Sequence, residues 1–223
     1  MINGLNLKKA FISGANNIIK SKKFVNELNI FPVPDGDTGT NMSMTISSGV
    51  EALSKLNDDV TTGEVIQAFV PALLRGARGN SGVILSILFR GFTQLFSSSK
   101  TLTGSDLAEA LDVGVKAAYS SVTKPTEGTI LTVARVACER AKEAAKINND
   151  AVFVWEKACA GAKDALKQTP ELLPVLKKAG VVDAGGKGLC LIFEGILSYI
   201  KDEIFIEPDE EITDIEEDDE FRN

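Results

Sequence analysis

The chain has 223 residues, of which 44% are hydrophobic and 25% are charged. This composition is typical of a folded protein and excludes wholesale disorder, and the length fits one compact domain. The chain contains no histidine. This excludes Ser-His-Asp catalysis, histidine general bases and nearly all imidazole metal sites, so that any metal has to be bound through oxygen.

The net charge of −7 comes from the end of the sequence. Residues 202–223 hold 12 of the 31 acidic side chains and one basic residue, Arg222, whereas residues 1–201 carry 23 basic and 19 acidic side chains. We predict a folded body over 1–201 and an acidic tail or linker over 202–223 that leads to further domains. No basic stripe, membrane-length apolar run or signal peptide is present, which predicts a cytoplasmic protein without nucleic-acid binding or a transmembrane segment.

Apolar residues recur at spacings of three and four along most of the chain, as in amphipathic helices. Strand-like alternation is nearly absent, and its best candidate is residues 204–206. The connections are short, which favours antiparallel neighbours. The sequence therefore predicts an all-α domain with helices over residues 5–21, 41–56, 62–75, 81–97, 105–122, 128–147, 150–168 and 186–203.

Glycines gather at four of the predicted helix junctions, next to Thr, Ser, Asn or Asp residues. Helix capping explains about one glycine at each junction. A helix start also exposes backbone N–H groups at the positive end of the helix dipole, which suits a phosphate. We predict phosphate binding at these starts, with capping as the alternative. The glycines are Gly36, Gly39, Gly76, Gly79, Gly82, Gly128, Gly185, Gly186 and Gly188.

Two carboxylates, Asp35 and Asp37, stand close together in a loop that Pro32 and Pro34 keep out of a helix. Such a pair repels unless a positive charge lies between them, and no Lys or Arg occurs over residues 24–54. A divalent cation is therefore the predicted partner. The alternative is that both acids cap the following helix.

An aspartate-nucleophile phosphatase would use the same Asp-x-Asp spacing. In that class the first aspartate ends a buried parallel strand, whereas here Phe-Pro-Val-Pro precedes Asp35 and the rest of the chain lacks βα alternation. The phosphatase stays an alternative, which an aspartyl-phosphate on Asp35 would identify. EF-hand and Walker loops are excluded because their obligatory residues are absent.

Four segments occur in one order along the chain: PVPDGDTGTNM (32–42), RGARGNSGVILS (75–86), PTEGTILTVAR (125–135) and VVDAGGKGL (181–189). Together they resemble the nucleotide-binding domain of the dihydroxyacetone kinase group, most closely the N-terminal domain of bacterial fatty acid kinases. The resemblance implies an eight-helix antiparallel barrel, with ATP or ADP bound in loops at one end and two Mg²⁺ ions held by carboxylates.

The resemblance also implies roles for single residues. Asp35 and Asp37 would be the catalytic metal ligands, bridging to the β- and γ-phosphates. Asn29 would be a third ligand through its amide oxygen, at a position where the dihydroxyacetone kinase subunit has aspartate. The implied nucleotide-binding residues are Thr38, Asn41, Met42, Asn80, Ser81, Gly82, Gly128, Thr129, Ile130, Asp183, Gly185 and Gly186.

The implied function is phosphoryl transfer from ATP·Mg²⁺ to a fatty acid carboxylate that a separate fatty-acid-binding protein presents, giving acyl phosphate. The absence of histidine agrees, because a carboxylate is ionised at neutral pH and needs no general base. Two alternatives remain open: a dihydroxyacetone kinase phosphoryl-donor subunit, and a non-catalytic regulatory module that holds ADP. The resemblance also allows a homodimer formed through domains beyond this chain.

Overall fold

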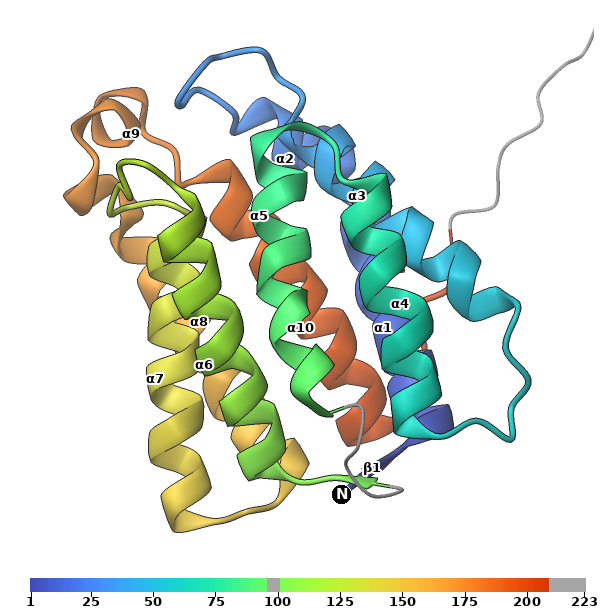
Figure 1. Cartoon of the computed structure of the whole chain (residues 1–223). Coiled ribbons are helices and arrows are strands. Elements are labelled where there is room, and N and C mark those ends of the chain that lie inside the picture. Colours follow the sequence, from blue (N-terminus) through green and yellow to red (C-terminus); the bar gives the residue numbers. More distant parts are fainter. Residues whose placement is uncertain (96–100, 209–223) are drawn as a thin grey trace, which may run out of the picture.

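The computed structural model describes residues 1–95 and 101–208, and almost all of its regular structure is helical (Figure 1). The all-α prediction is confirmed. Each of the eight predicted helices has a counterpart. These are α1 (Gly4–Lys20), α3 (Thr38–Ser54), α4 (Thr62–Gly76), α5 (Gly79–Arg90), α6 (Gly104–Ser121), α7 (Ile130–Ile147), α8 (Ala151–Leu172) and α10 (Ala184–Asp202).

Two six-residue helices, α2 (Lys22–Glu27) and α9 (Pro174–Ala179), were not predicted because they are too short to show a helical period. The helix predicted over 81–97 ends at Arg90 and continues as a 3₁₀ helix, η1 (Gly91–Leu95). Gly91 lies against the backbone of α6, which leaves no room for a side chain. Residues 96 and 97 lie outside the described part of the chain.

Residues 204–206, the best strand candidate of the sequence, do not form a strand. These residues are extended but belong to no sheet, and Ile206 instead exchanges hydrogen bonds with the Ser13 and Asn16 side chains of α1. The described residues form one small sheet, in which β1 (Ile2–Asn3) pairs antiparallel with β2 (Thr101–Leu102). The contacts of the body thus continue to Ile206, four residues past the end of α10.

The long helices alternate in direction, so that α1, α4, α6 and α8 start at one end of the molecule and α3, α5, α7 and α10 at the other (Figure 1). Closure of these helices into a barrel stays a prediction. Their buried faces form one apolar core, which includes a cluster of four phenylalanine rings from α1, α4, α5 and η1. None of the described helices combines the length and apolar character that a membrane span requires.

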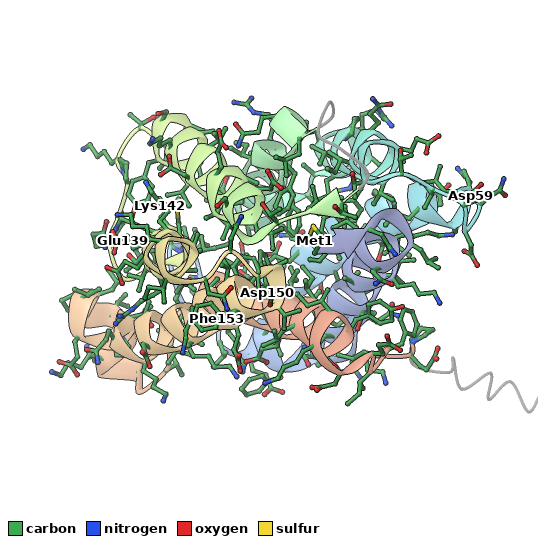
Figure 2. The ribbon with its side chains drawn as sticks, turned by 90° about the horizontal axis from the view of Figure 1, so that it is seen from below. Met1, Asp59, Glu139, Lys142, Asp150 and Phe153 are labelled. Carbon is green, nitrogen blue, oxygen red and sulfur yellow. The ribbon has the colours of Figure 1, made fainter. Side chains whose placement is uncertain are left out.

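The four helix starts at the lower end, which Figure 2 views directly, are closed by side chains. Thr61 and Thr103 form capping boxes with Glu64 and Asp106, at the starts of α4 and α6. Asn3 and Asp150 cap α1 and α8. These caps satisfy some of the first-turn amides at this end of the molecule.

Candidate functional site

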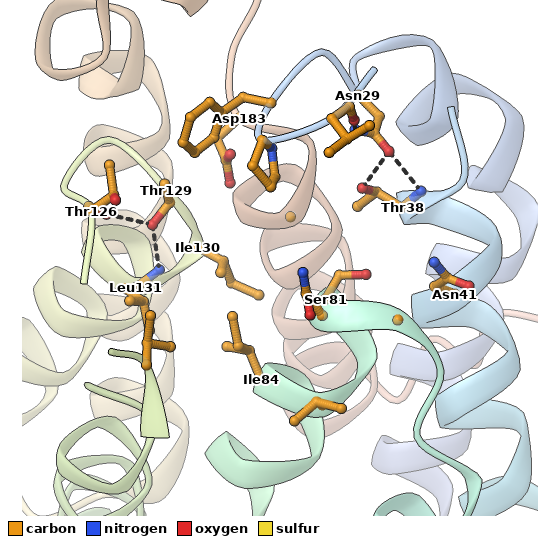
Figure 3. Close-up of a pocket in the computed structure, with 18 of the residues that line it drawn as sticks. Asn29, Thr38, Asn41, Ser81, Ile84, Thr126, Thr129, Ile130, Leu131 and Asp183 are labelled. Carbon is orange, nitrogen blue, oxygen red and sulfur yellow. Dashed lines mark hydrogen bonds between the residues drawn. The ribbon is translucent and has the colours of Figure 1, made fainter. Parts of the chain in front are cut away.

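A pocket of about 600 Å³ lies at the opposite end, where α3, α5, α7 and α10 start (Figure 3). Four helix N-termini around one cavity place four positive dipole ends there, which favours an anion such as phosphate. The pocket brings together most of the residues predicted for the site. These are Asn29, Asp35, Asp37, Thr38, Asn41, Asn80, Ser81, Thr129, Ile130, Asp183 and Gly185.

The start of α3 is capped by asparagine side chains from upstream. Asn29 Oδ1 accepts hydrogen bonds from the Asp37 N–H (3.2 Å), the Thr38 N–H (3.0 Å) and the Thr38 hydroxyl (2.7 Å) (Figure 3). Asn26 Oδ1 accepts from the Thr40 N–H (3.0 Å). Asp37 occupies the N-cap position but its carboxylate makes no cap hydrogen bond. The capping alternative therefore fails for Asp37.

Both aspartates are exposed at the pocket wall. Within the described residues, no lysine or arginine lies within salt-bridge distance of either carboxylate. The described part of the chain also contains no group of three or more His, Cys, Asp and Glu side chains suited to a metal. The carboxylate donors for a cation at this wall are therefore Asp35 and Asp37 alone.

Asn29 is buried, and its amide oxygen is already saturated by three donors. Its amide N–H also donates to the Val33 carbonyl (3.0 Å), on the other side of the loop. In this structure Asn29 holds the aspartate loop onto α3. Its role as a metal ligand stays a prediction, and direct ligation would require some of these hydrogen bonds to open.

The start of α5 differs from the capped starts, because no side chain caps it. The helix begins at Gly79, where a φ of +58° and the close approach of the Asn41 side-chain amide both disfavour a larger residue. Thr45 fixes the approach by accepting a hydrogen bond from the Arg78 N–H (3.0 Å). The first-turn amides beside Asn80 and Ser81 therefore border the pocket without a side-chain cap.

Ser81 lies inside the first turn of α5 and is not its cap, since the helix starts at Gly79, two residues before the predicted start at residue 81. Ser81→Ala is therefore expected to leave the melting temperature within about 1 °C of the parent. If phosphate binds here, the variant loses affinity for ATP, by about threefold to tenfold, while its affinity for adenosine is unchanged. Calorimetry with both ligands checks this. Equal losses for ATP and adenosine would contradict a phosphate contact.

Asp183 caps α10 from a buried position in the pocket wall. Its carboxylate accepts a hydrogen bond from the Gly186 N–H (2.7 Å), and its own N–H donates to the Thr169 hydroxyl (3.1 Å). Burial raises the pKa of this carboxyl to about 6, although hydrogen bonds from the Gly186 and Ile130 backbone oppose the shift. On α7, the Thr129 hydroxyl donates to the Thr126 carbonyl (2.7 Å) (Figure 3).

The raised pKa of Asp183 predicts a pH dependence of stability. The folded state binds this proton more tightly than an unfolded chain, whose aspartate pKa is 3.8. The stabilisation is full below about pH 3.8 and is lost as pH rises through 6, by about 3 kcal/mol in total. Asp183→Asn keeps an acceptor for the Gly186 N–H but cannot ionise.

Urea unfolding of parent and Asp183→Asn at pH 4, 5, 6 and 7 isolates this group, because every other carboxyl contributes equally to both proteins. We expect the variant to gain stability relative to the parent as pH rises, most steeply between pH 4 and 6. A constant difference across that range would contradict the assignment.

Four predicted nucleotide-binding residues lie outside the pocket lining. Met42 is fully buried and packs against Gly188 of α10, because one residue beyond Asn41 the helix faces the core. Gly82 lies against Thr45. Two further glycines pack in the wall behind the lining, Gly128 against Leu172 and Leu173, and Gly186 against Val133 and Leu166.

Apart from Ile130, the sequence did not single out the apolar residues of the lining. These residues come from the loop before α3, the first turns of α5 and α7, and the end of α6. The basic residue among the lining side chains is Lys124, which lies near Gly128 in the sequence. The apolar residues include Phe31, Val33, Val83, Ile84, Val122 and Leu131.

The aspartate-nucleophile phosphatase loses its structural basis. That mechanism needs the nucleophile at the end of a buried parallel strand, and within the described residues no strand precedes Asp35 except the two-residue β1. The loop before Asp35 instead follows the short helix α2.

An all-helical domain with a pocket at one end, bordered by four helix starts, is the class that this fold and site define. Residues 32–198 match the DAK2 domain family. Because this match spans most of the chain, the chain belongs to the DAK2 domain family, which confirms the resemblance to the dihydroxyacetone kinase group.

The chain is also similar to proteins of known sequence and, in its fold, to solved structures. Uncharacterised proteins of Staphylococcus aureus strains bovine RF122 and USA300 are each 47% identical over 202 residues, which cover 91% of this chain and 37% of theirs. The chain thus spans little more than a third of these relatives. The fold is similar to dihydroxyacetone kinase from C. freundii in complex with AMP-PNP and Mg²⁺, with a TM-score of 0.65 and 18% identity over 86% of this chain and 33% of that one. The native form of the same enzyme gives a TM-score of 0.57 at 16% identity, over 89% of this chain and 35% of that one.

Proposed function

We propose that the chain is the ATP·Mg²⁺-binding domain of a kinase that phosphorylates a fatty acid carboxylate. The observation that carries this proposal is the convergence of four helix N-termini on one pocket whose rim holds Asp35 and Asp37. Helix starts and backbone amides suit the phosphates, while two carboxylates without a basic partner suit a hard divalent cation. The apolar lining around Ile84 and Leu131 offers a surface against which the adenine base of ATP can pack.

The donor set fits Mg²⁺, which prefers oxygen ligands and is usually bound through one or two carboxylates and the phosphates of a nucleotide. Asp35 and Asp37 would supply the carboxylates. When bound, the ion neutralises negative charge on the phosphates. The backbone amides at the start of α5 and the Lys124 side chain add positive potential from the protein. The AMP-PNP and Mg²⁺ bound by the C. freundii enzyme support this proposal.

The choice of a carboxylate acceptor rests on the absence of histidine from the chain. An alcohol such as dihydroxyacetone gains from a general base, whereas a fatty acid is already ionised at neutral pH. The resemblance places Thr38 where the dihydroxyacetone kinase subunit has histidine, and the Thr38 hydroxyl donates a hydrogen bond to Asn29. A separate fatty-acid-binding protein would present the acyl chain.

The proposal is tested with radiolabelled ATP, Mg²⁺ and either a fatty-acid-loaded binding protein or dihydroxyacetone. Protein carrying this domain should transfer label to the fatty acid, and hydroxylamine should trap the product as a hydroxamate. Label on dihydroxyacetone would instead identify a triose kinase subunit. Slowly exchanging ADP with no transfer to either acceptor would identify the regulatory module.

A further inference from the structure

One wall of the pocket is the loop of residues 122–129 between α6 and α7, called here the α6–α7 loop. It contributes Val122, Lys124, Thr126 and Thr129 to the lining. Among the described residues, no backbone–backbone hydrogen bond outside the helices involves residues 122–128. The position of this wall therefore depends on side chains.

Glu127 is the residue of this loop that reaches both neighbouring helices. Its Oε1 accepts a hydrogen bond from the Tyr119 hydroxyl of α6 (2.8 Å). Its Oε2 accepts from the Thr132 hydroxyl (2.7 Å) and the Arg135 guanidinium (3.0 Å), both on α7. One carboxylate thus joins the loop to α6 with one oxygen and to α7 with the other, while it does not line the pocket itself.

The partners of Glu127 are linked to one another and to the loop backbone. Arg135 also donates to the Tyr119 hydroxyl (3.3 Å), and Thr132 accepts from the Gly128 N–H (2.8 Å). Burial raises the pKa of Glu127, but hydrogen bonds from Thr132, Arg135 and Tyr119 outweigh it, so the pKa lies below its usual value. The carboxylate is therefore charged at neutral pH and accepts hydrogen bonds through both oxygens.

We propose that Glu127 is a positioning residue that holds the α6–α7 loop against the pocket and thereby sets the affinity for nucleotide. The link to nucleotide rests on the proposed function, whereas the anchoring of the loop does not. Without Glu127, the loop loses its side-chain link to α6 and keeps the hydrogen bond from the Gly128 N–H to Thr132 and the local turn bonds of the Thr126 and Thr129 hydroxyls. A loosened wall has to be ordered again each time a ligand binds, which lowers the affinity.

Two variants and a matched control test the anchoring in the full chain without ligand. Glu127→Ala removes all three hydrogen bonds, and Glu127→Gln keeps an acceptor but loses the charge. Glu139→Gln is the control, because Glu139 pairs with the same arginine (3.0 Å) within α7 and does not touch the loop. Hydrogen exchange of peptides covering residues 122–129 should be at least about tenfold faster in Glu127→Ala, intermediate in Glu127→Gln and unchanged in Glu139→Gln.

Calorimetry with AMP-PNP and Mg²⁺ tests the link to nucleotide. We expect the dissociation constant to rise on the order of tenfold for Glu127→Ala and less for Glu127→Gln, with no change for Glu139→Gln. Unchanged exchange in the Glu127 variants would overturn the anchoring, and faster exchange with an unchanged dissociation constant would overturn its effect on affinity. A parent that binds no AMP-PNP would refute the proposed function, while the exchange data would still decide the anchoring. If Glu127→Ala does not fold, Glu127→Gln gives the same readouts.

Discussion

Asp35→Asn or Asp37→Asn is expected to remove most of the gain in ATP affinity that Mg²⁺ provides. The two carboxylates line the same pocket, and neither has a basic partner among the described residues. Loss of a residue that only orients a metal ligand typically costs 10–100-fold in metal affinity, so loss of a ligand should cost at least about 100-fold here. In EDTA the same variants should bind ATP as well as the parent or slightly better, because a negative charge near the phosphates is gone.

Titration calorimetry with ATP in Mg²⁺ and in EDTA measures both effects. Asp59→Asn is the matched control, because Asp59 is also an exposed loop aspartate but lies at the opposite end of the molecule (Figure 2). The melting temperature in EDTA should not fall in the Asp37 variant, since Asn26 and Asn29 cap α3 and the Asp37 carboxylate does not. Parental affinity of both variants in Mg²⁺ would refute the metal assignment.

Helical periodicity predicted the long helices because each buries a continuous apolar face over three or more turns. It could not predict where α3 begins. The expected start was residue 41, whereas the helix starts at Thr38 because Asn26 and Asn29 supply acceptors from upstream. Such caps depend on tertiary structure, so local sequence rules cannot predict them.

The four segments with glycine and polar residues predicted most of the pocket lining for a physical reason. A helix start that faces a pocket needs small or polar residues near its free amides, and this leaves a local signature in the sequence. Apolar lining residues such as Ile84 and Leu131 have no such signature, because an apolar residue in a helical pattern is predicted to lie in the core. The contacts of Glu127 were also hidden, since its partners on α6 and α7 are brought together only by the fold.

This chain alone is expected to form almost no acyl phosphate from free fatty acid. Phosphoryl transfer needs the acceptor carboxylate in line with the γ-phosphate, and such positioning accounts for roughly 7–11 kcal/mol of a barrier. The apolar cavity between α1, α6, α8 and α10 is only about 10 Å³, room for about one water molecule and not for an acyl chain. A groove on α6 and α7 is lined mainly by charged side chains, including Asp112, Lys116 and Lys142.

The assay is hydroxamate formation from ATP, Mg²⁺ and free fatty acid, with the chain alone and with a fatty-acid-loaded binding protein. A full-length relative with its loaded partner sets the reference rate, and the Asp37→Asn chain gives the background. Binding of AMP-PNP and Mg²⁺ confirms that the isolated chain has an intact pocket, so that a low rate reports the missing acceptor site. Turnover of free fatty acid near the reference rate would place the acceptor site inside this chain. Positioning of the carboxylate would then need no second protein, and the proposed role of the fatty-acid-binding protein would be refuted.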